Sequence, residues 1–128
     1  MSEKHVVRTE AAPAPFQGAP YSQAIAAGGF VFVSGQLGLE PGDTAISGGI
    51  EEQTEQVFAN LKAILEEAGT ALDRLVKTTV YLQHLDDFQA MNEVYAKHVG
   101  GQPPARATVE VAKLPSGALV EIEAVALL

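Results

Sequence analysis

The stretch from Gln102 to Leu128 carries two side chains whose chemistry could be combined in one site, Arg106 and Glu121. Arginine presents a planar fork of donors that binds a carboxylate through two hydrogen bonds and stays charged when water is removed. Glu121 stands in the apolar run GALVEIEAVALL, and apolar surroundings raise a carboxyl pKa toward values that suit proton transfer. Together they predict a site in which Arg106 holds the carboxylate of a small anion while Glu121 orients or deprotonates water.

Both residues also have a purely structural interpretation. Arg106 would form an ion pair with Glu110 or Glu121 that holds the two C-terminal strands together. Glu121 and Glu123 would then face solvent, between valine and isoleucine side chains that point inward. Periodicity leaves both interpretations open.

Other chemistries have weaker support. Tyr21, Ser34 and Asn92 are ambiguous, because a turn, a strand end and a helix flank often carry such residues. No histidine stands in a context that marks it as a base for Ser34. The sequence has no GxxxxGK[ST], GxSxG or GxGxxG motif, so a nucleotide site is not expected. The histidines lack the spacing of a metal site and are interpreted as surface residues: His5, His84 and His98.

Composition narrows the class of protein. A chain of 128 residues suits one domain, 1–128, that would gain stability from self-association. With 8 Lys and Arg against 16 Asp and Glu, the net charge of −8 opposes nucleic-acid and anionic-membrane partners. The absence of cysteine excludes disulfides, thiolate metal sites and a thiol nucleophile. No signal segment and no run of roughly 20 apolar residues is present, so we expect a cytoplasmic protein.

The elements that must position these residues follow from hydrophobic periodicity. Residues 1–19 are expected to form a short strand at 5–9 and a Pro/Ala-rich loop. The next elements are strands at 22–26 and 30–34 joined by a turn at 27–29, a loop at 38–49, and a helix from Ile50 to Gly69. This helix buries one face, formed by Val57, Leu61, Ile64, Leu65 and Ala68.

The second half of the chain is expected to form a strand, a helix and two further strands. LVKTTVYLQHL reads as a strand that turns Val76, Thr78, Val80 and Leu82 toward the helices. A second helix, capped by Asp86 or Asp87 and ending at 100–101, buries Phe88, Met91, Tyr95 and Val99, with Asn92 beside this stripe. A terminal β-hairpin would bury Ala105, Ala107, Val109 and Val111 on its first strand and Val120, Ile122, Ala124 and Ala126 on its second.

The order β-ββ-α-β-α-ββ predicts an α/β (α+β) domain, with a mostly antiparallel or mixed sheet and both helices on one face. The other face is semi-apolar and is most simply covered by another copy of the chain. If Arg106 and Glu121 lie on that face, the site forms near a subunit boundary.

Several motifs together resemble the RidA/YjgF family of enamine/imine deaminases. They occur in the family's order and cover almost the whole chain from about Pro20: APYSQAI, VFVSGQLGLEP, QTEQVFANLKAILEEAG, VKTTVYLQHLDDFQAMNEVY and PPARATVEVAKLPSGALVEIEAVA. The resemblance implies a chorismate-mutase-like fold assembled as a homotrimer with ligand sites between subunits. It also implies hydrolysis of 2-imino or 2-enamino acids, such as 2-iminobutanoate and 2-iminopropanoate, to 2-oxo acids and ammonia without a metal or cofactor.

The resemblance also implies residue roles. Arg106 would bind the substrate carboxylate and Glu121 would orient the attacking water. The pocket would be lined by Tyr21, Ser34 with the Gly35 backbone, Asn92 and Thr108, with Tyr21 and Asn92 contributed by a different subunit than Arg106. Two departures are Thr108, where the deaminases often have cysteine, and Ala19, where the family has glycine before Pro-Tyr.

Other functions compete with this expectation. The main alternative is a non-catalytic trimer that binds or senses small 2-oxo acids through Arg106. An RNA-cleaving activity, attributed to some relatives, is opposed by the negative charge and the lack of a basic stripe. A holdase role lacks an extended exposed apolar segment.

Overall fold

Alternating burial along six strands produces one sheet in the computed structural model, which describes residues 3–128. The strands are β1 (His5–Val7), β2 (Ala24–Ala27), β3 (Phe30–Leu37), β4 (Leu75–Leu82), β5 (Ala105–Glu110) and β6 (Val120–Leu127). Their spatial order is β1-β2-β3-β6-β4-β5; β4 and β5 run parallel, and the other neighbouring pairs are antiparallel. The predicted order of elements and the mixed sheet are confirmed.

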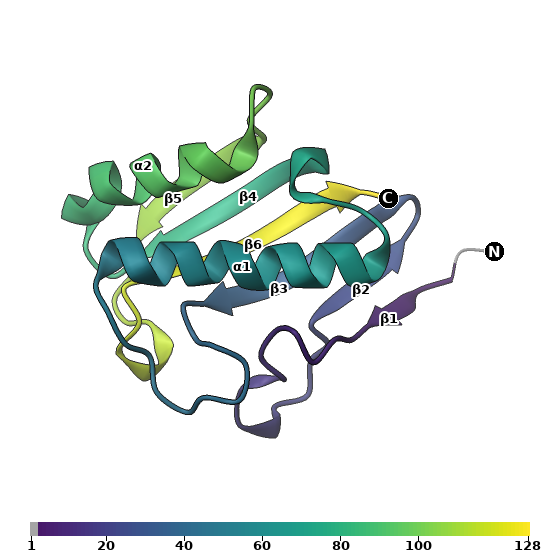
Figure 1. Cartoon of the computed structure of the whole chain (residues 1–128), viewed down its shortest axis with the longest axis horizontal. Helices are drawn as coiled ribbons and strands as arrows, with labels where there is room; N and C mark the ends of the chain where they lie inside the picture. The colour runs from purple at the N-terminus through teal and green to yellow at the C-terminus, as the bar shows by residue number, and fades with distance from the viewer. Residues whose placement is uncertain (1–2) are drawn as a thin grey trace.

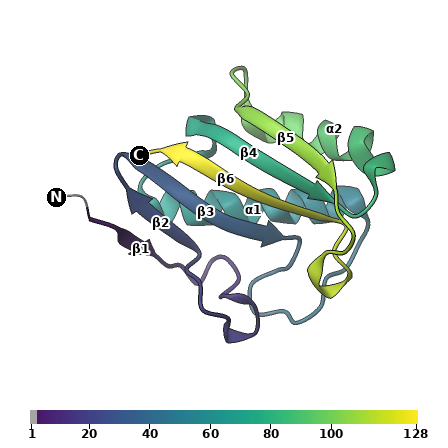
Figure 2. The same ribbon diagram turned by 180° about the vertical axis from the view of Figure 1, so that it is seen from behind.

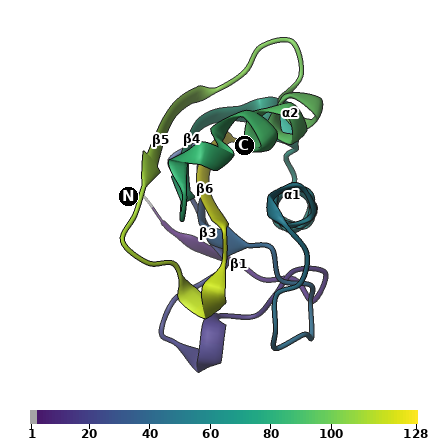
Figure 3. The ribbon, with the colours of Figure 1, turned by 90° about the vertical axis from the view of Figure 1, so that its left-hand side faces the viewer.

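Two helices, α1 (Ile50–Ala68) and α2 (Phe88–Val99), cover the same face of this sheet, as predicted (Figures 1 and 3). At the start of α1 the backbone N–H of Gly49 donates to Glu52 Oε1 at 2.9 Å. The helix ends at Gly69, whose φ of 90° is left-handed and suits glycine. Within residues 3–128, neither helix combines the length and apolar character needed to cross a membrane.

The core lies between α1, α2 and the sheet. The predicted stripe of α1 is buried apart from Ala68, which is partly buried, and Phe58 adds to it. The stripe packs over the buried residues of β3, β4 and β6. In β4 a bulge between Leu75 and Lys77 changes the expected alternation, so that Leu75 rather than Val76 is buried beside Thr78. In α2 the predicted residues Met91, Tyr95 and Val99 are buried, but Phe88, also predicted to be buried, is 39% exposed because it stands at the first position of the helix.

The β2–β3 connection is a tight turn, as predicted. Ala27 pairs with Phe30, and the two intervening residues, Gly28 and Gly29, have φ of 60° and 85°. Two consecutive positive φ angles define the turn type that matches the twist of a hairpin. The strands themselves differ from the expected ranges, since β2 begins at Ala24 and β3 continues to Leu37.

The predicted C-terminal β-hairpin is wrong, because β4 lies between β5 and β6 (Figure 2). β6 alternates buried apolar residues on one face and pairs on both edges, with β3 and with β4. β5 contains charged residues and takes the edge of the sheet, parallel to β4. The connection through Pro115–Gly117 therefore crosses the end of β4 instead of forming a tight turn.

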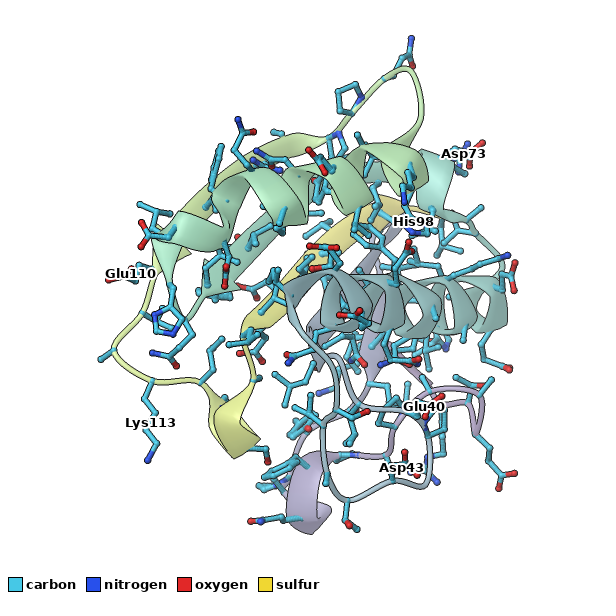
Figure 4. The ribbon with its side chains drawn as sticks, turned by 60° about the vertical axis from the view of Figure 1, so that its left-hand side comes forward. Glu40, Asp43, Asp73, His98, Glu110 and Lys113 are labelled. Carbon is cyan, nitrogen blue, oxygen red and sulfur yellow. The ribbon has the colours of Figure 1, made fainter. Side chains whose placement is uncertain are left out.

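α1 and α2 are joined by a contact that the sequence did not predict. His98, expected at the surface, lies between the two helices, with its ring stacked on Phe58 at 4.7 Å and Nε2 at 2.6 Å from Glu55 Oε1 (Figure 4). The predicted cap of α2 is only positional: Asp87 stands at the N-cap, but its side chain makes no capping hydrogen bond. α2 is therefore fixed mainly by packing against α1 and the sheet.

The face opposite the helices is open and partly apolar. Cross-strand register aligns Val6, Ile25, Phe32 and Val125 in one row across β1, β2, β3 and β6. Val6 is 58% exposed and Phe32 is 47% exposed. Ile25 and Val125 are partly exposed. A continuous row of large, partly or fully exposed apolar side chains is typical of a surface that another protein chain covers.

Candidate active site

One pocket of about 370 Å³ at an end of the sheet is lined by four of the predicted site residues: Tyr21, Ser34, Gly35 and Glu121. The loop that follows β1, the loop between β3 and α1 and the connection between β5 and β6 gather at this end (Figures 1 and 2). We call these four residues the acidic half-site. They come from separate parts of the sequence, and the strands β3 and β6 bring them together.

A bulge in β3 makes room for Glu121. Register with β6 passes from Val33 opposite Ala124 to Gln36 opposite Ile122, so Ser34 and Gly35 fall outside regular pairing. A Cβ atom on Gly35 would lie 2.9 Å from Glu121 Cδ, which is too close for real atoms. Glycine at position 35 therefore lets the Glu121 carboxyl group occupy the space that a side chain would fill.

Ser34 is held rather than free. Its backbone N–H donates to Gln23 O at 2.9 Å, and its Oγ donates to Ser22 O at 2.6 Å. The Tyr21 hydroxyl accepts a hydrogen bond from the backbone N–H of Phe16 at 2.6 Å. The pocket wall is thus tied by hydrogen bonds to the loop that follows β1.

Burial raises the pKa of the Glu121 carboxyl group, and the negative charge of Glu123 raises it further. Glu123 itself accepts a hydrogen bond from the Tyr81 hydroxyl, and this bond, followed by burial, raises the pKa of Tyr81. A carboxyl group with a raised pKa takes up and releases a proton closer to neutral pH than an ordinary glutamate. Glu121 has the electrostatic character that a general base requires.

Arg106 lies on the other face of the sheet, beneath α2. It is in register with Thr78, whose hydroxyl is buried against the Tyr95 hydroxyl at 2.6 Å. The guanidinium carbon lies 4.7 Å from the ring centroid of Tyr95 and 5.5 Å from that of Phe88. Two aromatic faces against one guanidinium group fix its orientation by cation–π attraction.

This placement corrects the predicted faces of β5. Arg106 and Thr108 point toward the helices, and the small apolar residues expected in the core, Ala105, Ala107 and Val109, are exposed. An alternating strand at the sheet edge does not reveal which of its faces is covered. The helix-covered face takes the longer Arg106 because α2 supplies rings on which its stem and guanidinium group pack.

The ion pair offered as a structural role for Arg106 is also wrong. No acidic side chain among residues 3–128 pairs with Arg106. Glu110 instead accepts a hydrogen bond from the backbone N–H of Leu85 at 2.8 Å, and it extends outward beyond α2 (Figure 4). Arg106 is therefore a half-buried cation without an anionic partner in the described chain.

Two further polar atoms near Arg106 lack partners. Asn92 Oδ1 and Thr108 Oγ1 are buried and make no hydrogen bond within the described residues. Asn92 lies on α2 between Phe88 and Tyr95, and Thr108 is the next residue on the Arg106 face of β5. Buried polar atoms are nearly always paired, so this group, which we call the arginine half-site (Arg106, Asn92 and Thr108), favours a bound polar molecule.

The predicted site is thus divided into two groups within one chain. Asn92 was expected to come from a different subunit than Arg106, but it lies on the α2 face whose Phe88 and Tyr95 rings contact Arg106 of the same chain. Tyr21 lines the pocket of Glu121. Sequence reasoning missed Phe88 and Tyr95 as partners of Arg106, although their helical spacing around Asn92 places all three on one face of α2. Within residues 3–128 no cluster of three His, Asp or Glu side chains could hold a metal ion.

Known proteins of one family match this chain over nearly its whole length. The family model described as Endoribonuclease L-PSP matches residues 9–128. A RutC family protein of Pyrococcus abyssi is 52% identical over 124 residues, covering 96% of each chain. The mouse 2-iminobutanoate/2-iminopropanoate deaminase is 43% identical, covering 96% of this chain and 90% of its own. The crystal structure of RidA from Psychrobacter sp. PAMC 21119 superposes with a TM-score of 0.92 at 44% identity, covering 97% of this chain and 99% of that one.

Proposed function

This chain belongs to the endoribonuclease L-PSP family, also known as the RidA/YjgF family, and from that membership we propose that it hydrolyses reactive 2-imino and 2-enamino acids to 2-oxo acids and ammonia. The proposed substrates are small imino acids such as 2-iminobutanoate and 2-iminopropanoate. The observation that carries the proposal is the arginine half-site: a half-buried guanidinium group without an anion, beside two unpaired polar atoms. A ligand carboxylate would satisfy Arg106 through two hydrogen bonds.

The proposed enzyme is a homotrimer with the chorismate-mutase-like fold, and its sites lie between neighbouring copies. The division of the site supports this assembly, since Arg106 and Glu121 face opposite sides of one sheet. In this trimer the arginine half-site of one copy would face the acidic half-site of the next, an arrangement that a rotational axis repeats at every interface. The exposed apolar row of Val6, Ile25, Phe32 and Val125 supplies surface that such an assembly would bury.

In the proposed mechanism Arg106 holds the substrate carboxylate and so fixes the position of the neighbouring C2 atom. Glu121 takes a proton from a water molecule as the water oxygen attacks C2 of the protonated imine, and the nitrogen becomes a neutral amine. Glu121 then gives this proton to the amine nitrogen. The C–N bond breaks and releases ammonia while the C2 hydroxyl group loses its proton to Glu121 or solvent, which leaves the C2 carbonyl of the 2-oxo acid. Because the imine carbon is already electrophilic, positioning and one proton shuttle supply most of what the reaction needs.

The direct test measures 2-oxobutanoate release from 2-iminobutanoate generated in situ, with the spontaneous rate subtracted. Wild type, Arg106→Ala and Glu121→Gln are compared after circular dichroism and light scattering establish that all three fold and associate alike. We expect only wild type to accelerate hydrolysis. If wild type adds nothing but binds 2-oxobutanoate through Arg106, the chain is a non-catalytic 2-oxo acid binding protein.

RNA cleavage, which the family description names, is the weaker candidate for this chain. Its net charge of −8 opposes the phosphate backbone, and neither half-site presents a basic stripe. Absence of RNA cleavage by the protein that releases 2-oxobutanoate would separate the two activities.

A further inference from the structure

Gln23 is a buried residue, 4% exposed, that lines the same pocket as the acidic half-site. Its side-chain amide is fully hydrogen-bonded. The backbone N–H of Thr9 donates to Oε1 at 2.7 Å, and Nε2 donates to the carbonyl oxygens of Thr9 at 3.0 Å, Ala12 at 3.2 Å and Pro13 at 2.8 Å. One side chain thus fixes the backbone of the loop from Thr9 to Pro13.

Besides the Gln23 amide, this part of the loop is held by Ala12, which is 2% exposed and packs in the hydrophobic core. Within the described chain, the other hydrogen bond of residues 9–13 is local, from Ala11 N–H to Thr9 Oγ1. Pro13 has no backbone N–H, so it cannot donate to a neighbouring element. The loop therefore depends on the Gln23 amide for its long-range hydrogen bonds.

The loop that Gln23 holds forms a wall of the Glu121 pocket. Pro13, Ala14 and Phe16 line that pocket together with Glu121. On its other side Gln23 supports the bulge of β3, because its carbonyl oxygen accepts the Ser34 N–H at 2.9 Å. Gln23 therefore joins the two sides of the pocket through one residue.

We propose that Gln23 is a positioning residue for the acidic half-site, holding residues 9–13 so that Pro13, Ala14 and Phe16 close the pocket around Glu121. The inference rests on the proposed function, because it places Gln23 in the pocket of the carboxylate that would activate water. Its action is indirect, because both N–H groups of the amide donate to loop carbonyl oxygens and none is free to bind a ligand. The wall covers one side of the pocket that holds Glu121 and leaves room there for a water molecule. Burial is the main cause of the raised pKa of the Glu121 carboxyl group.

The test uses Gln23→Leu, which removes all four hydrogen bonds of the amide. Gln53→Leu is the matched control, because Gln53 is also 4% exposed and anchors backbone at Gly48 and Leu119, yet it does not line the pocket. The readout is the pKa of the Glu121 carboxyl group, measured in the full chain by following the NMR signal of its carboxyl carbon as the pH changes. The signal is assigned by its absence from the spectrum of Glu121→Gln. This readout needs no turnover, and loss of stability alone does not move it.

We expect Gln23→Leu to lower the Glu121 pKa toward that of an ordinary glutamate, and Gln53→Leu to leave it at the wild-type value. The pH midpoint of deamination should move down with it, and kcat/KM should fall about 10- to 100-fold as the wall loses its position. If Gln23→Leu does not fold, Gln23→Met keeps the length and volume of the side chain and gives the same comparison. An unchanged Glu121 titration in the folded variant would overturn the role of Gln23.

The same experiment separates this inference from the proposed function. If Gln23→Leu shifts the Glu121 pKa but wild type has no deaminase activity, Gln23 remains a positioning residue and the proposed deaminase activity is rejected. If wild type turns over normally and the Glu121 pKa is unchanged in Gln23→Leu, the positioning role of Gln23 is rejected and the proposed deaminase activity stands.

Discussion

Arg106 and Glu121 face opposite sides of one sheet. Arg106 is in register with buried Thr78 on the side that α2 covers, and Glu121 is in register with Tyr81 on the open side. A small ligand bound to Arg106 therefore cannot reach the Glu121 of the same chain through the sheet between them. The two half-sites form one reaction site only if a second copy supplies the missing half.

Arg106→Lys should lose most deaminase activity although the charge is kept. A single ammonium group cannot reproduce the two-pronged contact with a carboxylate, nor stack between Phe88 and Tyr95. Loss of one charge-assisted hydrogen bond predicts a fall of about 10- to 100-fold in kcat/KM. Arg74→Lys is the control, because Arg74 is exposed and its guanidinium group donates to the Leu128 carbonyl oxygen, away from both half-sites. Near-normal turnover of Arg106→Lys would count heavily against a carboxylate clamp.

Glu121→Gln should stabilise the fold at neutral pH. Because the pKa of Glu121 is raised by folding, its contribution favours the folded state below the ordinary glutamate pKa and is lost as pH rises through the raised pKa. The melting temperature of Glu121→Gln should exceed that of wild type near pH 7, and the difference should shrink below about pH 4.3. Glu93→Gln, at an exposed position on α2, is the control. A lower melting temperature at pH 7 would mean that the carboxylate stabilises the fold.

Gly35→Ala should inactivate the protein without unfolding it. The added methyl group would overlap the Glu121 carboxyl group, a flexible side chain that can move away. Displacing a reacting group by about 1 Å costs on the order of 100-fold in rate. Gly101→Ala is the matched control, because a Cβ atom there meets nothing within 4 Å. Equal activity of the two variants in the 2-oxobutanoate assay would show that Glu121 need not occupy this position.

Tyr95→Phe should separate stability from ligand binding. It leaves the buried Thr78 hydroxyl without its partner, at a cost of about 1–3 kcal/mol in the free energy of unfolding measured with urea. The phenyl ring still covers Arg106, so the affinity for 2-oxobutanoate measured by calorimetry should change little. Adding Thr78→Val should restore part of the stability, because neither polar atom is then left unpaired. A large loss of affinity would instead assign the hydroxyl to the ligand.

Periodicity predicted the helices and the buried faces of α1 and β4 because each strand or helix pattern is set by local alternation. Which strands pair depends on contacts between distant segments of the chain. Nothing in the residues around Pro115 requires β6 to pair with β5. The core-forming β6 gains more by pairing on both edges, between β3 and β4. The error in the hairpin and the error in the β5 faces therefore have one origin.

The candidate site residues could be selected from the sequence, but their grouping could not. Arg106 and Glu121 looked like one site because they seemed to share a hairpin. Their separation depends on β4 and on the cover that α2 provides, which are long-range features. Asn92 illustrates the same limit, since its neighbours on α2 were predictable, whereas the burial of its Oδ1 atom without a partner was not.

The most direct test of a shared site mixes two inactive variants, Arg106→Ala and Glu121→Gln, by co-refolding equal amounts. If each site joins Arg106 of one copy to Glu121 of the next, random mixing leaves about one quarter of the sites with both groups intact. We therefore expect the mixture to release 2-oxobutanoate at about one quarter of the wild-type rate, although each variant alone is inactive. A mixture that forms hybrid assemblies and remains inactive would contradict a site built from two copies.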